Sequence, residues 1–178
     1  MPIVAETPRL ILRHLEERDA AFFLELTNDP DWIRFIGDRG LRTTDDARAY
    51  LRDRLIAMYA KLGFGLNCVE SKETGEPLGI CGMIKRDTLE DVDLGFAFLP
   101  QARGQGLAFE ASVAAMDHAR ESLGLSRVVA IVAPGNARSI TLLEKLGFDL
   151  EGHVRLPPNG ANELSLYAAT LRPDPGGH

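Results

Sequence analysis

A strand-to-helix junction at residues 99–111, LPQARGQGLAFEA, constrains this chain more than any other stretch. A segment with the period of a strand ends at Pro100, and a helical pattern begins at Leu107. Between them, Gly104 and Gly106 bring bare backbone to the start of the helix. Free N–H groups and the positive end of the helix dipole favour an anion there, most naturally a phosphate. The alternative is a tight connection that binds nothing.

Two common phosphate motifs do not fit the residues that follow. A Walker loop requires Lys and then Ser or Thr after its last glycine, where this chain has Leu107 and Ala108. A dinucleotide fingerprint would place its third glycine at Phe109. It would also need an acidic residue at the end of the next strand, which ends instead in Ala-Pro-Gly at 133–135. A nicotinamide-dependent dehydrogenase is therefore not expected. Arg103 adds a full positive charge beside the glycines.

The periodicity around the junction predicts a mixed α/β sheet in one domain. Segments with period two predict strands at 8–15, 63–71, 76–86, 91–100, 126–134, 148–156 and 163–171. Helical patterns occur at 16–29, around Trp32, at 43–62, 107–123 and 136–147. Three consecutive strands followed by alternating helices and strands predict a central mixed, mostly antiparallel sheet flanked by helices. We expect this domain to span residues 1–171, with a disordered C-terminal tail, RPDPGGH, at 172–178.

Composition excludes several classes of protein. The chain has 178 residues, a length that suits one domain, and a net charge of −6 that argues against direct nucleic-acid binding. No apolar stretch approaches the ~20 residues of a membrane helix, and the first residues do not resemble a signal peptide. We expect a cytoplasmic protein without membrane contact. The sequence leaves its oligomeric state open.

Cys68 and Cys81 match no metal-ligand spacing, and no metal site is expected. They flank a predicted hairpin turn and are therefore candidates to face each other across paired strands. We interpret them as buried thiols.

Two sequence blocks resemble the GNAT superfamily, the acyl-CoA-dependent N-acyltransferases. QARGQGLAFEA is similar to that family's Gln/Arg-x-x-Gly-x-Gly/Ala block, and PGNARSITLLEKLGF is similar to its second block. The opening ETPRLILRHLEERDAAFF and the segments EGHVRL and ELSLYAATL resemble the branch of the ribosomal-protein alanine N-acetyltransferases. The resemblance covers nearly the whole chain, with the blocks in the family's order.

The resemblance implies that acetyl-CoA is the cosubstrate and assigns residues to it. Backbone N–H groups from Arg103 through Ala108 would hold the pyrophosphate, and Asn136 would contact the pantetheine arm or cap its own helix. Two neighbouring strands would part to admit that arm, with main-chain contacts from Phe98 and Leu99. The implied coenzyme-binding residues are Phe98, Leu99, Gln101, Arg103, Gly104, Gln105, Gly106, Leu107, Ala108, Asn136 and Ser139.

The implied reaction transfers an acetyl group to a primary amine, which attacks only when it is neutral, so a base must remove a proton. Asp93 stands where relatives often carry a Glu, and its neighbours Gly95 and Ala97 are small enough to leave room for a substrate. Other candidates for the base are Glu110, which also suits the first turn of a helix, Glu163 and His153.

The thiolate that leaves would be assisted in many relatives by a Tyr, but that position here is Leu143. The resemblance offers Ser139 in its place, either as a donor to the sulfur or as a contact to the coenzyme arm. A serine that only bonds the helix backbone is the alternative. The acceptor would be a protein N-terminus or a small amine. A non-catalytic module that senses acyl-CoA is the alternative function.

Overall fold

The computed structural model describes residues 2–156 and 163–171. The tail predicted at 172–178 lies outside the described residues, so the predicted end of the domain at 171 stays a prediction. Across the described residues, no helix has the length and apolar character needed to cross a membrane.

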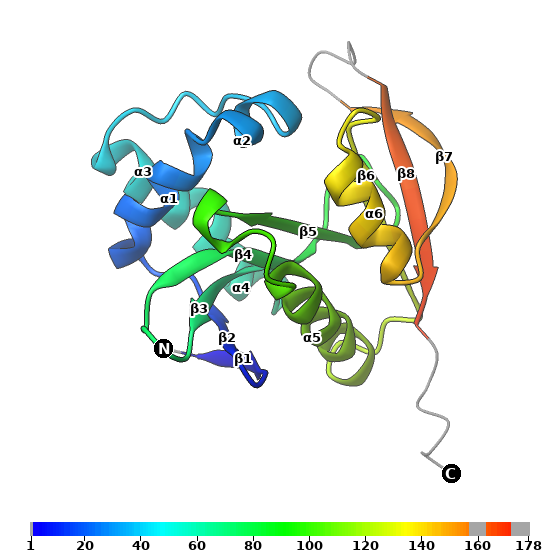
Figure 1. The fold of residues 1–178 in the computed structure, drawn as a ribbon, viewed down its shortest axis with the longest axis horizontal. Helices are drawn as coiled ribbons and strands as arrows, with labels where there is room; N and C mark the ends of the chain where they lie inside the picture. Colours follow the sequence, from blue (N-terminus) through cyan, green and yellow to red (C-terminus); the bar gives the residue numbers. More distant parts are fainter. Residues whose placement is uncertain (1, 157–162, 172–178) are drawn as a thin grey trace.

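All the described strands belong to one mixed sheet (Figure 1). They are β1 (Ile3–Glu6), β2 (Leu10–His14), β3 (Leu66–Ser71), β4 (Pro77–Ile84), β5 (Asp93–Phe98), β6 (Arg127–Val132), β7 (Asp149–Arg155) and β8 (Glu163–Thr170). Their spatial order is β1-β2-β3-β4-β5-β6-β8-β7. Every neighbouring pair is antiparallel except β5 and β6, which confirms the predicted mixed, mostly antiparallel sheet.

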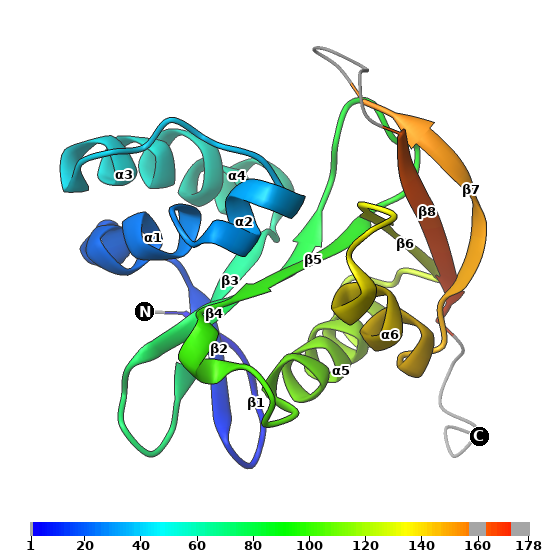
Figure 2. The ribbon, with the colours of Figure 1, turned by 45° about the horizontal axis from the view of Figure 1, so that its top comes forward.

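The helices cover both faces of this sheet (Figure 2). They are η1 (Glu17–Asp19), α1 (Ala20–Thr27), α2 (Pro30–Phe35), α3 (Thr44–Tyr50), η2 (Leu51–Ile56), α4 (Ala57–Leu62), η3 (Pro100–Ala102), α5 (Leu107–Glu121) and α6 (Ala137–Lys145). One hydrophobic core lies between the sheet and α5 and α6, and a second lies between the sheet and the helices from α1 to η2.

The parallel pair β5 and β6 is short. Its register contains one Cα pair, Asp93 with Val129, and the Val129 N–H group donates to the Val92 carbonyl (3.0 Å). Beyond that point each strand continues toward its own helix, α5 or α6. We call the space between residues 94–99 and 130–133 the β5–β6 fork. The fork confirms the expectation that two strands part where the coenzyme arm was predicted.

Three details differ from the sequence analysis. Strand β1 was not predicted, because its four residues carry too little alternation to stand out. The helix predicted at 43–62 begins as expected, with a capping box between Thr43 and Asp46, but its middle third, η2, is π-helical.

Cys68 and Cys81 are both buried free thiols, as expected. However, Cys68 lies opposite Ile80, and each cysteine belongs to a different core, so the prediction that they face each other is wrong.

Candidate functional site

The glycine junction forms a loop that opens α5. Gly104 and Gly106 have φ values of +77° and +76°, a region that side chains with a Cβ rarely adopt, and Gly106 is the N-cap residue. A Cβ built at Gly104 would meet nothing within 4 Å, so the space beside the loop is open. The hydrogen-bond ladder of α5 starts with the Glu110 N–H group, which donates to the Gly106 carbonyl (3.1 Å). The N–H groups just before it lack a carbonyl within the helix and are suited to an anion.

Residues between β1 and β2, far from this loop in the sequence, contact it and hold it in place. The Arg9 guanidinium donates to the Gln105 carbonyl (2.8 Å) and pairs with the Glu110 carboxylate (2.8 Å). The Glu110 carboxylate also accepts the Thr7 hydroxyl. Burial alone would raise the pKa of Glu110, but the hydrogen bonds from Thr7 and Arg9 outweigh it and hold that pKa below its ordinary value. Glu110 lies in the first turn of α5, as the sequence allowed, and it also anchors the loop through contacts to Thr7 and Arg9 that the sequence did not predict.

Arg103 lies between the loop and α2. Its guanidinium pairs with Asp29 (2.7 Å) and Asp31 (3.0 Å), and it donates to the Phe98 carbonyl (3.0 Å). The Arg103 N–H group also donates to the Pro100 carbonyl (3.2 Å). Its positive charge is therefore compensated by two carboxylates that the sequence analysis did not associate with the loop.

The end of β5 presents Phe98 and Leu99 differently. The Leu99 N–H group donates to the Leu78 carbonyl (2.9 Å), and the Leu99 carbonyl accepts the Ala102 N–H group (3.0 Å). Because successive residues of a strand direct their main-chain groups to opposite edges, the Phe98 groups face the fork, where the carbonyl already accepts the Arg103 guanidinium and the N–H group is the one offered to a ligand. The predicted main-chain contact to a coenzyme arm is thus better placed at Phe98 than at Leu99.

Asn136 and Ser139 occupy the first turn of α6, on the other side of the fork. Asn136 is the N-cap residue, and its Oδ1 accepts the Ser139 N–H group (3.3 Å). This confirms the capping role considered for Asn136. Leu143, which replaces the family tyrosine, is 1% exposed and packs in the core beneath α6.

Asp93 lies at the closed end of the fork, where β5 and β6 still pair. The residue is 1% exposed, and its Oδ1 is buried without a hydrogen bond from the described residues. The Arg86 Nε–H group donates to Asp93 Oδ2 (3.4 Å), and the same nitrogen lies 3.4 Å from Oδ1 without making a hydrogen bond to it. Burial raises the pKa of Asp93 above its ordinary value, and Arg86 offsets that effect only in part. A buried carboxylate with a raised pKa and an unsatisfied oxygen is a reasonable general base.

The space beside Gly95, which the sequence analysis reserved for a substrate, is filled by the protein itself. A Cβ at Gly95 would come within 2.7 Å of Ile84 Cδ1 and 3.3 Å of Leu66 Cδ2. The glycine therefore allows close packing of neighbouring strands, and any acceptor has to approach by another route.

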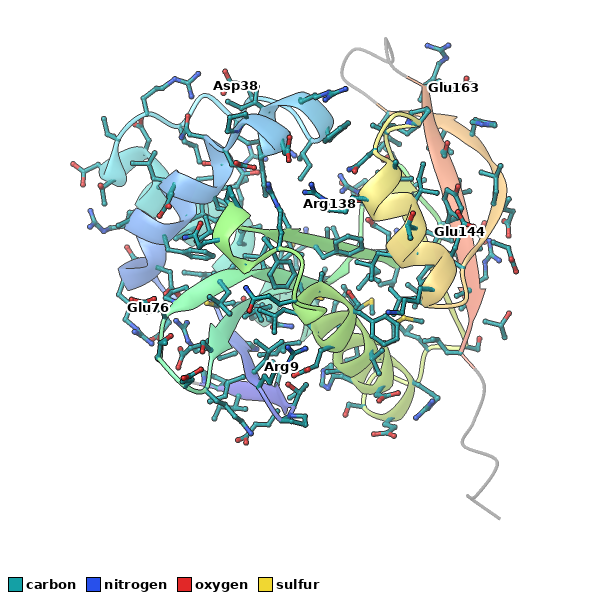
Figure 3. The ribbon with its side chains drawn as sticks, in the orientation of Figure 1. Arg9, Asp38, Glu76, Arg138, Glu144 and Glu163 are labelled. Carbon is teal, nitrogen blue, oxygen red and sulfur yellow. The ribbon has the colours of Figure 1, made fainter. Side chains whose placement is uncertain are left out.

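The remaining candidates lie elsewhere. Glu163 begins β8 and is exposed at the outer end of that strand (Figure 3). His153 is exposed on β7, one of the two edge strands of the described sheet, opposite Ser165. No group of three or more His, Cys, Asp or Glu residues within the described ranges is arranged to hold a metal ion.

The arrangement matches what a coenzyme with a pyrophosphate and an extended arm requires. Unpaired N–H donors stand at the loop, main-chain groups of Phe98 face the fork, and a polar turn at Asn136 lies opposite. The residues of the chain therefore fit acetyl-CoA as a ligand.

Comparison with known proteins gives the family. Residues 9–149 match the model of the acetyltransferase (GNAT) domain. The chain is 30% identical to the uncharacterized protein YkkB of Bacillus subtilis over 154 aligned residues. The alignment covers 84% of this chain and 87% of YkkB. It is 31% identical to the putative ribosomal N-acetyltransferase YdaF of Bacillus subtilis, over 92% of this chain and 91% of YdaF.

Solved structures agree on the fold. The crystal structure of an acetyltransferase from Agrobacterium tumefaciens superimposes with a TM-score of 0.77 at 27% identity, covering 95% of this chain and 94% of that chain. The expected GNAT fold is thereby confirmed. With its family model matched over most of its length, this chain belongs to the GNAT acetyltransferase family.

Proposed function

We propose that this chain transfers an acetyl group from acetyl-CoA to a primary amine at the β5–β6 fork. GNAT acetyltransferases use acetyl-CoA as the acetyl donor. The observation that carries the proposal is the fork itself, because its open end has a loop of N–H donors and its closed end has a buried carboxylate. These two features are what binding and deprotonation respectively require.

In this proposal the loop holds the pyrophosphate through backbone N–H groups between Gly104 and Ala108. The Arg103 N–H group, which the sequence included with them, already donates to the Pro100 carbonyl. Gln101 and Arg103 flank the pyrophosphate. Because Asp29 and Asp31 already compensate the charge of Arg103, its electrostatic attraction for the pyrophosphate is reduced. Asn136 caps the start of α6, and its amide nitrogen is the proposed donor to the pantetheine arm. When bound, the thioester supplies an acetyl group that needs no further activation.

Asp93 is the proposed general base. A primary alkyl amine is mostly protonated at pH 7, and removal of its proton precedes attack on a carbonyl carbon. Because Asp93 is almost fully buried, we propose that a water molecule relays the proton to its unsatisfied Oδ1. The raised pKa of Asp93 strengthens it as a base compared with an ordinary aspartate.

Ser139 is the proposed donor to the departing sulfur. It stands in the first turn of α6, its hydroxyl makes no contact that fixes it elsewhere among the described residues, and it is only half-buried. Leu143, at the position of the family tyrosine, has no hydrogen-bond donor and packs in the core.

The proposed acceptor is a protein N-terminus or a small primary amine. The sequence resembles the branch of the ribosomal-protein alanine N-acetyltransferases, and YdaF is named a putative ribosomal N-acetyltransferase. Peptides with an N-terminal alanine are therefore the first acceptors to test. The net charge of −6 is compatible with a cationic acceptor.

The test is release of free coenzyme A. The protein is incubated with acetyl-CoA and, separately, an N-terminal alanine peptide, an N-terminal serine peptide, spermidine and free amino acids. Thiol release that depends on one of these amines and on the protein supports the proposal. Binding of coenzyme A without release for any amine would favour the sensing module. No binding of coenzyme A at millimolar concentration would refute both.

A further inference from the structure

One carboxylate of α2 stands between two arginines that follow the two strands of the fork. Asp31 Oδ2 is 3.0 Å from an Arg103 nitrogen and 3.6 Å from Arg138 Nη1. Arg103 follows β5, and Arg138 lies in the first turn of α6, after β6. Figure 3 shows Arg138 on the side of α6 that faces the N-terminal helices. Asp31 therefore links the two sides of the open end of the fork.

The two ion pairs of Asp31, with Arg103 and with Arg138, differ in strength. Arg103 is 23% exposed and has three acceptors within 3.0 Å, namely Asp29, Asp31 and the Phe98 carbonyl. Arg138 is 70% exposed, and its contact with Asp31 is the long one. An exposed ion pair at this distance stabilises little, so Arg138 exchanges partners more readily than Arg103 does.

Both guanidinium groups reach the same oxygen atom, so the Arg138 guanidinium lies beside that of Arg103, the residue that immediately precedes the glycine loop in the chain. A guanidinium can bind two oxygens of a phosphate group at once. A phosphate therefore binds Arg138 more strongly than the Asp31 carboxylate does, because that carboxylate is shared with a second arginine. The side chain of Arg138 is long and exposed, so it can turn toward such a group without moving α6.

We propose that Arg138 is a phosphate-binding residue that exchanges Asp31 for a phosphate of the coenzyme, and that Asp31 lowers coenzyme affinity by competing for it. The inference rests on the proposed function, since it requires coenzyme A in the fork. It goes further by adding a binding residue and an acidic competitor from the opposite helical layer. The exchange breaks one ion pair and forms another, and it leaves Arg103 in place.

A double-mutant cycle on coenzyme A affinity tests the exchange. The dissociation constant is measured by calorimetry for the wild type, Arg138→Gln, Asp31→Asn and the double variant. We expect Arg138→Gln to weaken binding about fivefold and Asp31→Asn to tighten it about threefold, in the range of an exposed charge pair. In the Arg138→Gln background, Asp31→Asn should no longer tighten binding, because the competition no longer exists.

Two controls isolate the competition. Asp38→Asn removes a carboxylate from the segment between α2 and α3, where it pairs with Arg42, and should leave the affinity unchanged. S-acetylpantetheine has no phosphate, so Arg138→Gln should not alter its binding. Thermal melts of each variant check that the fold is intact.

Three results would overturn the inference. Unchanged coenzyme A affinity in Arg138→Gln would remove the phosphate contact. If Asp31→Asn still increases coenzyme A affinity in the double variant, Asp31 acts by long-range charge repulsion and not by competing for Arg138. Equal weakening for S-acetylpantetheine would make Arg138 a structural residue. In each case the wild type still binds coenzyme A, whereas failure of the proposed function would appear as no binding by the wild type.

Discussion

The closed end of the β5–β6 fork and the start of α5 each hold a carboxylate, and the two carboxylates are in opposite environments. Glu110 accepts hydrogen bonds from Thr7 and Arg9, which lower its pKa. Asp93 is more deeply buried, has an oxygen that accepts no hydrogen bond from the part of the chain that the structure describes, and has a raised pKa. The contacts of Glu110 stabilise the loop. The burial of Asp93 places a carboxylate with a raised pKa at the point where the pairing of β5 and β6 ends. The same chemical group thus stabilises the loop at one point and is, in our proposal, the base at the other.

The two pKa shifts have opposite consequences for stability. The lowered pKa of Glu110 contributes stability above the ordinary glutamate pKa, and this contribution is lost as the pH falls through the folded-state value. The raised pKa of Asp93 favours its protonated form in the fold. Its contribution is favourable at low pH and is lost as the pH rises through the raised folded-state value.

Replacement of Asp93 by Asn should have the largest effect on activity. We expect kcat/KM at pH 7 to fall by about 10²–10⁴, the range for loss of a general base, while coenzyme A affinity is retained. Thermal stability at pH 7 should be equal to or higher than that of the wild type, because a buried charged form is removed. Steady-state kinetics and a melting curve check both. A large loss of stability together with activity would make Asp93 a structural residue.

Gly106→Val should disrupt the loop, the other region of the comparison. A β-branched residue at a φ of +76° is strained by roughly 1–2 kcal/mol. Its Cβ would also lie 3.6 Å from Arg9 Nη2, on the guanidinium that holds the loop. We expect coenzyme A affinity to fall about thirtyfold, or about 2 kcal/mol, by calorimetry. Gly124→Val, at a φ of +67° beyond the end of α5, is the matched control for strain. Equal affinities in the two variants would show that the loop is only a connector.

Ser139→Ala tests the chemistry at the mouth of the fork. If the hydroxyl assists the departing sulfur, kcat should fall about tenfold with acetyl-CoA affinity nearly unchanged, since one hydrogen bond made in the transition state is lost. Thr141→Ala removes an exposed hydroxyl from the same helix and should be neutral. A fall in affinity at constant kcat would reassign Ser139 to the coenzyme arm.

Glu110→Gln should have the smallest effect on catalysis and a visible effect on stability. We expect a loss of about 1 kcal/mol in the free energy of unfolding at pH 7, because a partly exposed ion pair and a charged hydrogen bond are removed. The difference from the wild type should shrink as the pH falls through the folded-state pKa of Glu110. Denaturant titrations at pH 7 and pH 3 measure it. A loss of kcat as large as that of Asp93→Asn would reverse the roles assigned to the two carboxylates.

The glycine loop and the order of the elements could be predicted from the sequence because both depend on local patterns. Positive φ at Gly104 and Gly106 and the helix that follows are encoded within a few residues, and period-two segments mark the strands. The capping box at Thr43 and Asp46 is likewise local.

The supporting contacts could not be predicted, because they join residues far apart in the chain. Arg9 reaches Glu110, and Asp29 and Asp31 reach Arg103, without any motif in the sequence around them. The opposite faces of Cys68 and Cys81 depend on the register of β3 and β4, which the hairpin turn alone does not fix. Burial of Asp93 likewise depends on packing from several elements.

The pH dependence of kcat/KM for Asp93→Asn tests the central claim most directly, with the acceptor identified by coenzyme A release. If Asp93 removes the proton from the amine, the deficit of the variant should be largest near pH 6 and should shrink steadily toward pH 9, where more of the amine arrives neutral. Glu110→Gln should follow the wild-type profile throughout. A constant ratio between the wild type and Asp93→Asn over this range would contradict the assignment of Asp93 as the base.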